Sequence, residues 1–393
     1  MFRPSGGRVH EIDLADPEVL ADPFTAYGRA REAGPVARLP MPGIGTVWVL
    51  TRHEDARAML GDPRFALTSA SFLRPDVPEH CLRYMRSMAE MNGAEHKRLR
   101  RTVSPAFSVR HARSLAPVIE RIVGRLLDAL PDGDPVDLVP HLTRPLPIEV
   151  ICELVGIPEA DRPRWHEYGA SVASGAGPAF AEAVPRFIAD AIAAVERARA
   201  DPGDDVLGTL VGTEDLAETD LVMLVWNLML AGQTPTNLIA NAVGHLLTDP
   251  DALAALRADP GLLPGAVEEL IRWCGPTLLT IPRYATEDLD LHGTPVAKGE
   301  AVCVSVAAAH RDPRAYADPD RFDPRRPAGP PGHLGFGHGP HFCLGAALAR
   351  TQTEVAIGAL LDRFPRLALA GDLAALRAPD PGTWRLSALP VSR

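Results

Sequence analysis

Residues 336–345 read Phe-Gly-His-Gly-Pro-His-Phe-Cys-Leu-Gly, and this stretch decides how the rest of the chain is interpreted. It contains the pattern F-x-x-G-x-x-x-C-x-G, which occurs by chance in roughly one chain of this composition in a thousand. The pattern predicts a glycine-rich loop that brings Cys343 to the start of a helix, where loop amides and the positive helix end stabilise a thiolate. Gly337 and Gly339 allow close backbone approach to a flat ligand, and Gly345 keeps the first helical turn slim. Most free cysteines are ordinary buried residues, but this spacing argues against that interpretation here.

The other cysteines carry no such signal. The 393-residue chain has five cysteines, an odd number, and none of them forms a C-x-x-C pair. This distribution argues against a disulfide framework and favours a reducing cytosol. We therefore expect four structural thiols, which are Cys81, Cys152, Cys274 and Cys303.

Composition and charge exclude several classes of protein. Hydrophobic residues make up 46% of the chain, which excludes a mainly disordered protein. The net charge of −10 disfavours a nucleic-acid-binding role. The N-terminus lacks the apolar region of a signal peptide, and the longest uncharged stretch, Leu221–Thr248, contains too many amides and hydroxyls to span a bilayer. The sequence therefore predicts a cytoplasmic protein without a membrane segment.

Helical spacing of apolar residues dominates the chain. Strand patterns are short and few, which argues against a doubly wound parallel sheet, so the sequence predicts a mainly α fold with a small β portion. The predicted helices are Glu18–Ala33, His96–Ala106, Ala116–Leu130, Ile148–Leu154, Ala181–Ala200, Leu221–Thr248, Asp251–Asp259, Gly265–Cys274 and Leu344–Arg363, and the predicted strands are Thr46–Leu50, Asp288–Leu291 and Ala301–Ala307.

The cysteine loop resembles the haem-binding loop of the cytochrome P450 family, and the resemblance extends across most of the chain. Glu269-Leu270-Ile271-Arg272 is similar to that family's E-x-x-R helix, and Arg326 stands where the family has the third member of an ion network. The resemblance implies a single P450 haem domain over residues 1–393, a triangular helical prism with a long central helix over the haem. It also implies haem b with Cys343 as the thiolate ligand, which favours O–O cleavage.

Further positions match the family's haem contacts. Four residues match the groups with which the family holds the two haem propionates. They are His96 and Arg100, which lie four residues apart on a predicted helix, and Arg283 and His341. Two buried carboxylates need paired cations, which explains the residue types. The resemblance adds further haem contacts at Ala231, Gly232, Phe336, Gly337 and Gly345.

The central helix departs from the family pattern A-G-x-(Asp/Glu)-Thr-(Thr/Ser), whose acid–alcohol pair relays protons during oxygen activation. Residues 231–237 read Ala-Gly-Gln-Thr-Pro-Thr-Asn. An alignment on Ala231-Gly232 puts Thr234 at the acid position and Pro235 at the alcohol position. An alignment on the sequence after Thr236 puts Gln233 at the acid position and keeps Thr234 as the alcohol. Neither register supplies an acid. Pro235 lacks an N–H, so a kink near Ala231 is expected.

Two chemical outcomes remain open for this helix. In the first, a water or the substrate supplies the missing proton path, and the reaction is ordinary hydroxylation. In the second, the chemistry needs less acid-assisted oxygen activation, as in radical coupling, desaturation or peroxide use. Gln233, Thr234 and Thr236 are the candidate catalytic residues in either case.

Family position also indicates a substrate pocket that is apolar and in part aromatic. Its roof would come from Phe72–Met91, and the remaining walls from the central helix, from the stretch after the E-x-x-R helix and from the C-terminal hairpin. A Met-rich stretch at helical spacing is also compatible with plain packing. The predicted pocket residues are Tyr84, Met85, Met88, Trp226, Asn227, Leu230, Leu278, Leu279, Thr280, Ile281 and Trp384.

The resemblance implies a monooxygenase that uses O2 and a ferredoxin with its reductase to oxidise a small to medium organic molecule, in secondary-metabolite biosynthesis. We find no flavin or iron–sulfur segment, so separate electron donors are expected, and Arg98, Arg101 and Arg350 are basic candidates for docking them. Two alternatives remain, namely oxidative C–C or C–O coupling without net oxygen insertion, and a haem-binding scaffold that has lost catalysis.

Overall fold

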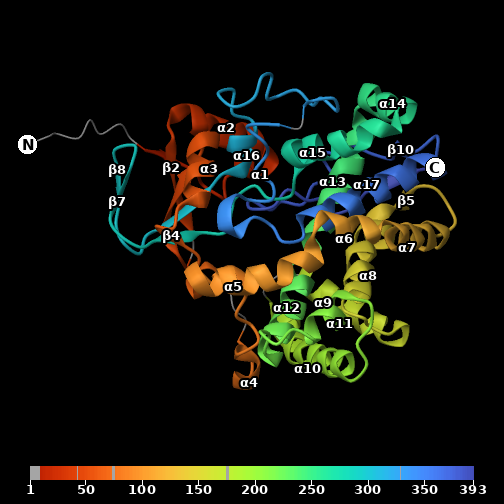
Figure 1. Cartoon of the computed structure of the whole chain (residues 1–393). Coiled ribbons are helices and arrows are strands. Elements are labelled where there is room, and N and C mark those ends of the chain that lie inside the picture. The colour runs from red at the N-terminus through yellow and green to blue at the C-terminus, as the bar shows by residue number, and fades with distance from the viewer. Residues whose placement is uncertain (1–8, 42, 73–75, 174–176, 328) are drawn as a thin grey trace, which may run out of the picture. The chain divides into compact units, whose positions relative to one another are not determined.

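The computed structural model describes residues 9–41, 43–72, 76–173, 177–327 and 329–393, and Figure 1 shows its helices and strands. The chain divides into two compact units, each built from separate stretches of sequence. Unit 1 comprises residues 1–71, 251–343 and 377–385, and unit 2 comprises residues 72–250, 344–376 and 386–393. The prediction of one haem domain over the whole chain is not tested by this division and stays a prediction.

Unit 1 is built on a six-stranded sheet of order β1-β2-β3-β9-β6-β4, accompanied by a separate β7-β8 hairpin. Strand β3 pairs antiparallel with β2 and parallel with β9, so segments far apart in the chain lie side by side. The strands are β1 (His10–Glu11), β2 (Val36–Met41), β3 (Gly45–Leu50), β4 (Phe65–Ala66), β6 (Arg283–Ala285), β7 (Leu289–Leu291), β8 (Thr294–Val296) and β9 (Ala301–Val304). The helices are α1 (Pro17–Ala21), α2 (Pro23–Ala33), α3 (His53–Gly61), α14 (Pro250–Ala258), α15 (Leu263–Cys274) and α16 (Val306–His310), the first residue of α14 belonging to unit 2.

The central strands of this sheet are covered on both faces, because alternate side chains of a strand point to opposite sides. Val49 and Cys303 pack in one core cluster with Tyr27 of α2. Val304, on the opposite face, packs in a second cluster with Met59 of α3. Burial on both faces explains why β9 reads as a continuous apolar run.

Unit 2 is almost entirely helical. Helix α17 (Ala346–Arg363) packs against α6 (Val109–Ser114), α7 (Ala116–Asp128) and α13 (Gln233–Thr248), and α10 (Pro178–Ala200) packs against α9 (Arg162–Ala173), α11 (Val206–Val211) and α12 (Glu218–Ala231). Strands β10 (Ala368–Leu369), β11 (Pro390–Ser392) and β5 (Val136–Asp137) form a small antiparallel sheet. The remaining helices are α4 (Glu79–Leu82), α5 (Gly93–Val103) and α8 (Pro145–Leu154), with a π-helical turn at Val139–Thr143.

The predicted mainly α fold with a small β portion is confirmed, and the differences have local causes. The predicted helix Glu18–Ala33 is two helices, because Asp22 ends α1 and its carboxylate caps α2, which begins at Pro23. The predicted strand Ala301–Ala307 ends at Val304, because Ser305 caps α16. Short strands such as β1 and β4 left no readable pattern in the sequence.

The long stretch Leu221–Thr248 is also divided. Helix α12 ends at Ala231, Gly232 forms the connecting turn and α13 begins at Gln233. The break therefore falls where the kink was expected, but Pro235 lies in the first turn of α13. Proline costs little there, since the first amides of a helix have no partner within it.

Candidate functional site

The loop before Cys343 has the tight backbone that its glycines predict. Gly337 and Gly339 both have a φ of 72°, in the left-handed region that favours glycine. A Cβ atom on Gly339 would lie 2.9 Å from the Cα atom of Gly61 in α3. The loop therefore approaches α3 more closely than a residue with a side chain at position 339 would allow. The Cys343 amide donates to the Phe336 carbonyl at 2.9 Å, which closes the loop around the thiol.

Cys343 differs from the other four cysteines in exposure. It is the exposed one of the five, whereas the others are buried. Burial raises the pKa of each of those four thiols, to about 12 for three of them, so they remain protonated at neutral pH. The residues concerned are Cys81, and with the larger shifts Cys152, Cys274 and Cys303. A thiolate ligand therefore has one candidate in this chain.

A buried ion network lies in the same unit as the loop. The Glu269 carboxylate of α15 accepts from Nε and Nη2 of Arg272 at 2.7 and 2.8 Å, and from Nε of Arg326 at 3.0 Å. The side chains of Glu269 and Arg272 are 1% and 2% exposed. Both guanidinium groups also donate to backbone carbonyls of residues 317–321, so the network ties α15 to the loops that follow α16.

Arg283 is a buried cation that pairs with no acid among the described residues. It stands on β6 with 6% of its surface exposed, and its Nη1 donates to the Leu60 carbonyl at 2.9 Å. Burial lowers the pKa of this guanidinium, which is the sign of a charge in need of a counter-ion. His341, in the short 3-10 turn Gly339–His341 of the same unit, is half-buried.

In unit 2, His96 and Arg100 lie one turn apart on α5. His96 is 3% exposed, and burial, with the neighbouring Arg100 charge as a smaller cause, lowers its pKa. Arg100 is half-buried. A neutral imidazole next to a cation is suited to donate a hydrogen bond to an anionic group.

The start of α13 supplies hydroxyl groups and no carboxylate. Ala231 and Thr234 are exposed and Asn227 and Leu230 half-buried, so the end of α12 and the start of α13 carry accessible positions at a spacing of three to four residues. Thr236 is 8% exposed, and its hydroxyl makes no hydrogen bond within the described residues. The side chain of Gln233 lies outside the described part of the chain.

Gly232, between the two helices, has a structural reason of its own. A Cβ atom there would lie 2.1 Å from Cδ1 of Ile151 in α8. A side chain at position 232 would therefore need Ile151 to shift, which explains a preference for glycine at this turn.

Several predicted pocket residues are buried. Trp226 is 3% exposed, with its ring centroid 5.3 Å from that of Phe187 and 6.0 Å from that of Phe180. Leu278 is fully buried in the cluster that contains Tyr27. The side chains of Trp226 and Leu278 therefore expose little or no surface in this structure. Tyr84 and Met85 are also buried, at 1% and 6% exposed.

Other residues of the predicted pocket keep accessible surface. Met88, Asn227, Leu230, Leu279 and Thr280 are half-buried, and Ile281 is 45% exposed. The Thr280 hydroxyl accepts the Val304 amide at 2.9 Å, which commits it to the sheet. Half-buried Trp384 packs edge-on against Phe24 at 4.9 Å. Within the predicted roof Phe72–Met91, residues 73–75 lie outside the described residues.

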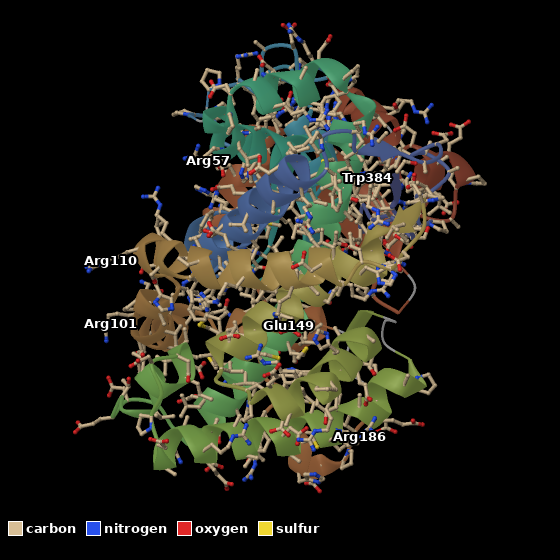
Figure 2. The ribbon with its side chains drawn as sticks, turned by 90° about the vertical axis from the view of Figure 1, so that its right-hand side faces the viewer. Arg57, Arg101, Arg110, Glu149, Arg186 and Trp384 are labelled. Carbon is tan, nitrogen blue, oxygen red and sulfur yellow. The ribbon has the colours of Figure 1, made fainter. Side chains whose placement is uncertain are left out.

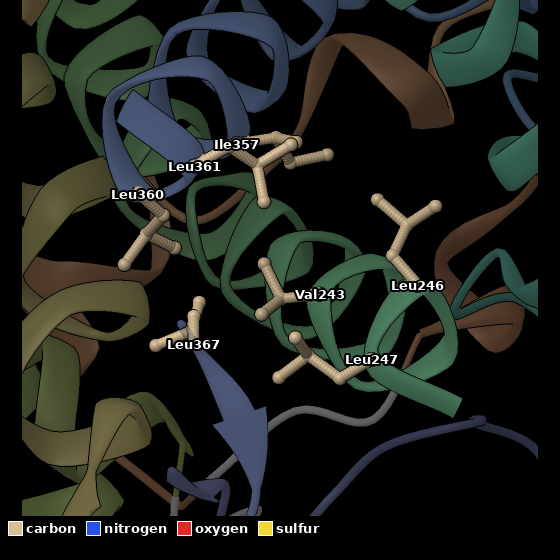
Figure 3. Close-up of a pocket in the computed structure, with 7 residues that line it drawn as sticks. All are labelled: Val243, Leu246, Leu247, Ile357, Leu360, Leu361 and Leu367. Atoms are coloured by element: carbon tan, nitrogen blue, oxygen red, sulfur yellow. The ribbon is translucent and has the colours of Figure 1, made fainter. Parts of the chain in front are cut away.

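A separate small apolar cavity lies in unit 2 between α13 and α17 (Figure 3). Its walls are aliphatic side chains such as Val243 and Leu246 of α13 and Ile357 and Leu360 of α17. It contains no polar group that would orient a ligand, and we assign it no function.

Comparisons with known proteins agree with this geometry. The sequence profile named Cytochrome P450 matches residues 261–370. The chain is 40% identical to cytochrome P450 monooxygenase PikC of Streptomyces venezuelae over 98% of this chain and 94% of that protein, and 39% identical to biflaviolin synthase CYP158A1 of Streptomyces coelicolor over 91% and 89%. The solved structure of the ligand-free P450 monooxygenase TamI is similar with a TM-score of 0.88 at 38% identity, over 99% of this chain and 94% of that one.

The chain belongs to the cytochrome P450 family, and it is an oxidoreductase of the monooxygenase class. The family has a haem-thiolate cofactor, and the residues described above fit such a group. The single exposed thiol stands in a glycine loop, and Arg283 is a buried cation without an acid partner among the described residues. No helix of the described residues is long and apolar enough to cross a membrane.

Sequence reasoning missed the role of α3. The approach of Gly339 to Gly61, and the bond from Arg283 to the Leu60 carbonyl, both use the C-terminal end of this helix. The glycine at 61 was the only available signal, and it is uninformative without the loop beside it.

Proposed function

We propose that this protein is a P450 monooxygenase that holds haem b through Cys343 and oxidises an apolar small to medium organic molecule of secondary metabolism. The observation that carries the proposal is the exposed thiol in its glycine loop, in a chain whose other thiols are buried and protonated. Relatives with 36–40% identity include a mycinamicin IV hydroxylase/epoxidase and a 6-deoxyerythronolide B hydroxylase.

The chain's own groups divide the work of holding the cofactor. The two propionates are proposed to be bound, and their buried carboxylates neutralised, by four cationic or hydrogen-bonding side chains, which are His96, Arg100, Arg283 and His341. A thiolate-bound haem supplies the activation of O2. Ala231, Gly232, Phe336, Gly337 and Gly345 are proposed as its close neighbours.

Thr234 and Thr236 are proposed to handle protons and water near the oxygen. The accessible positions at Ala231 and Thr234 support the alignment that keeps Thr234 close to the cofactor. The unpartnered hydroxyl of Thr236 supports a second site for an ordered water. Since hydroxyls donate and accept but do not lose protons readily, the acid must come from water or substrate. Gln233 would orient such a water.

The proposed pocket follows the exposed members of the predicted set. The residues that keep accessible surface are the first candidates for ligand contact, and they are Met88, Asn227, Leu230, Leu279 and Ile281. The buried members of the set stay proposed pocket residues, and they are Tyr84, Met85, Trp226 and Leu278. Apolar walls with one amide favour a ligand that carries few charges.

Electrons are proposed to come from a ferredoxin and its reductase, in the cytoplasm, where buried thiols stay reduced. Figure 2 shows Arg101 projecting outward from α5. Arg98 is less available because it donates to the Asp215 carbonyl at 2.8 Å, and Arg350 on α17 is half-buried. Arg101 is therefore the first residue to test for docking of an acidic partner.

Oxidative coupling is the second candidate function. The missing acid at the start of α13 and the 39% identity to a biflaviolin synthase favour it. Product formed under ¹⁸O₂ separates the two functions, because hydroxylation leaves labelled oxygen in the product and coupling does not.

The test of the proposal is the carbon monoxide difference spectrum of purified protein. Cys343→Ala should lose the band that marks thiolate ligation, and Cys81→Ala should keep it. A Cys343→Ala protein that keeps the thiolate band would refute the proposal. Ligands are then screened by the spectral shift they cause in the wild-type protein, with product analysis for each hit.

A further inference from the structure

The loop that leads to Cys343 begins tightly packed against α15. A Cβ atom on Gly335 would lie 2.4 Å from Cγ2 of Ile271, so no side chain fits there. Leu334 is 3% exposed. Backbone amides at such a place need partners within the protein, because water does not reach them. The amides of Leu334 and Gly335 both donate to imidazole nitrogens.

His310 receives the first of these amides. The Leu334 N–H donates to Nε2 of His310 at 2.8 Å, and Nδ1 of the same ring lies 2.9 Å from the Arg272 carbonyl of α15. Since a nitrogen that accepts carries no proton, Nδ1 must be the protonated one and must donate to Arg272. His310 is 2% exposed, and burial among other cations lowers its pKa well below the ordinary value, in agreement with a neutral ring.

The bond between His310 and Arg272 is reciprocal. Nη1 of Arg272 donates to the His310 carbonyl at 2.7 Å, while the His310 ring donates to the Arg272 carbonyl. The orientation of the imidazole is therefore fixed from both sides by α15. The same Arg272 is held by Glu269, so the ion network and the imidazole share one anchor.

His333 receives the second amide in a similar way. The Gly335 N–H donates to Nδ1 of His333 at 3.2 Å, and Nε2 of that ring lies 3.2 Å from the Glu268 carboxylate of α15. Both imidazoles thus connect one loop amide to α15. The His310 connection is the shorter and the more deeply buried of the two.

The hydrogen bonds continue from this anchor to the thiol. The Leu334 carbonyl accepts the Gly337 amide at 2.8 Å, and the Phe336 carbonyl accepts the Cys343 amide at 2.9 Å. The loop between Leu334 and Cys343 is closed on itself and connected to α15 at its first residue.

We propose that His310 is a positioning residue, whose neutral imidazole fixes the backbone of the Cys343 loop relative to α15 and so sets where the thiolate stands. The proposal rests on the proposed function, in which Cys343 is the haem ligand. His333 reinforces the same connection through the next amide.

Two substitutions separate the two bonds of the ring. His310→Asn puts an amide near the position of Nδ1, so it keeps the donation to Arg272 but does not reach Leu334. His310→Gln puts its terminal group near the position of Nε2, where its oxygen accepts from Leu334. His292→Asn, at an exposed ring paired with Asp55, is the control for loss of a histidine elsewhere in the unit.

Two measurements on the haem-loaded protein test the proposal. Hydrogen exchange of the Leu334 amide should be about tenfold faster in His310→Asn, as expected for a lost hydrogen bond, and near wild type in His310→Gln. The fraction of the carbon monoxide complex with the thiolate band should fall severalfold in His310→Asn, and His310→Gln should restore it.

Two results would overturn the proposal. One is faster exchange at Leu334 in His310→Asn with an unchanged thiolate band. The other is fast exchange of the Leu334 amide in the wild-type protein. This second measurement can be made even if neither His310 variant folds. Failure of the proposed function gives a different result, since Cys343→Ala would then keep the thiolate band whatever happens at His310.

Discussion

Glu269→Gln removes one negative charge from between two guanidinium groups and keeps the shape of the side chain. The carboxylate accepts two hydrogen bonds from Arg272, one from Arg326 and one from the Asp323 amide. Within the described residues no other carboxylate pairs with Arg272 or Arg326. The substitution therefore leaves Arg272, whose side chain is 2% exposed, as a buried cation without a counter-ion.

The expected cost follows from that burial. Removing one partner of a buried ion pair costs about 3–5 kcal/mol, because the remaining charge stays out of water without compensation. The free energy of unfolding, measured by urea titration with a common slope, should fall by this amount in Glu269→Gln. Breaking an exposed pair costs about 0–1 kcal/mol.

The control for this prediction is Glu18→Gln. Glu18 pairs with Arg29 at 2.9 Å, and the side chains are 72% and 58% exposed. The free energy of unfolding of this variant should lie within about 1 kcal/mol of the wild-type value. If Glu269→Gln costs no more than the control, the carboxylate is not what compensates the buried Arg272, and the reasoning fails.

Two further predictions concern the cysteine loop and the pH dependence of stability. Gly339→Ala should lower the free energy of unfolding by about 1–3 kcal/mol more than Gly332→Ala in urea titration, because both residues have positive φ but only a Cβ at 339 would meet Gly61, at 2.9 Å; equal losses would contradict the close approach. Hydrogen bonds to the Glu149 carboxylate, the largest effect coming from His166, lower its pKa from 4.5 to about 2. The stabilisation that this carboxylate contributes is therefore complete above about pH 4.5 and is lost as the pH falls toward 2. The stability difference between wild type and Glu149→Gln should therefore narrow over that range, and a difference independent of pH would contradict it.

The central helix shows what its sequence can and cannot predict. Pro235 indicates a break near Ala231, because its missing N–H leaves that carbonyl without a helical partner. The turn falls at Gly232, where an added Cβ atom would lie 2.1 Å from Cδ1 of Ile151 in α8. That contact joins residues far apart in the chain, and no local pattern reports it.

The burial of the predicted pocket residues depends on distant neighbours. Trp226 has the same local pattern as Leu230, one turn further along α12. It is buried because Phe180 and Phe187 of α10 pack against it, while Leu230 keeps accessible surface. Sequence spacing assigns residues to a helix, but the neighbouring helix decides which of them face a ligand.

The E-x-x-R helix and the cysteine loop are recognised in the sequence as two independent motifs. In the structure they form one assembly, because Glu269 orients Arg272, Arg272 orients His310, and His310 accepts the amide of Leu334 at the start of the loop. Each motif alone specifies a residue type, a carboxylate, a guanidinium or a thiol. In our proposal the position of the thiol depends on the imidazole between them, which lies on a third segment and belongs to neither motif. A sequence can therefore name the ligand, whereas the distance at which the protein holds it comes from long-range hydrogen bonds.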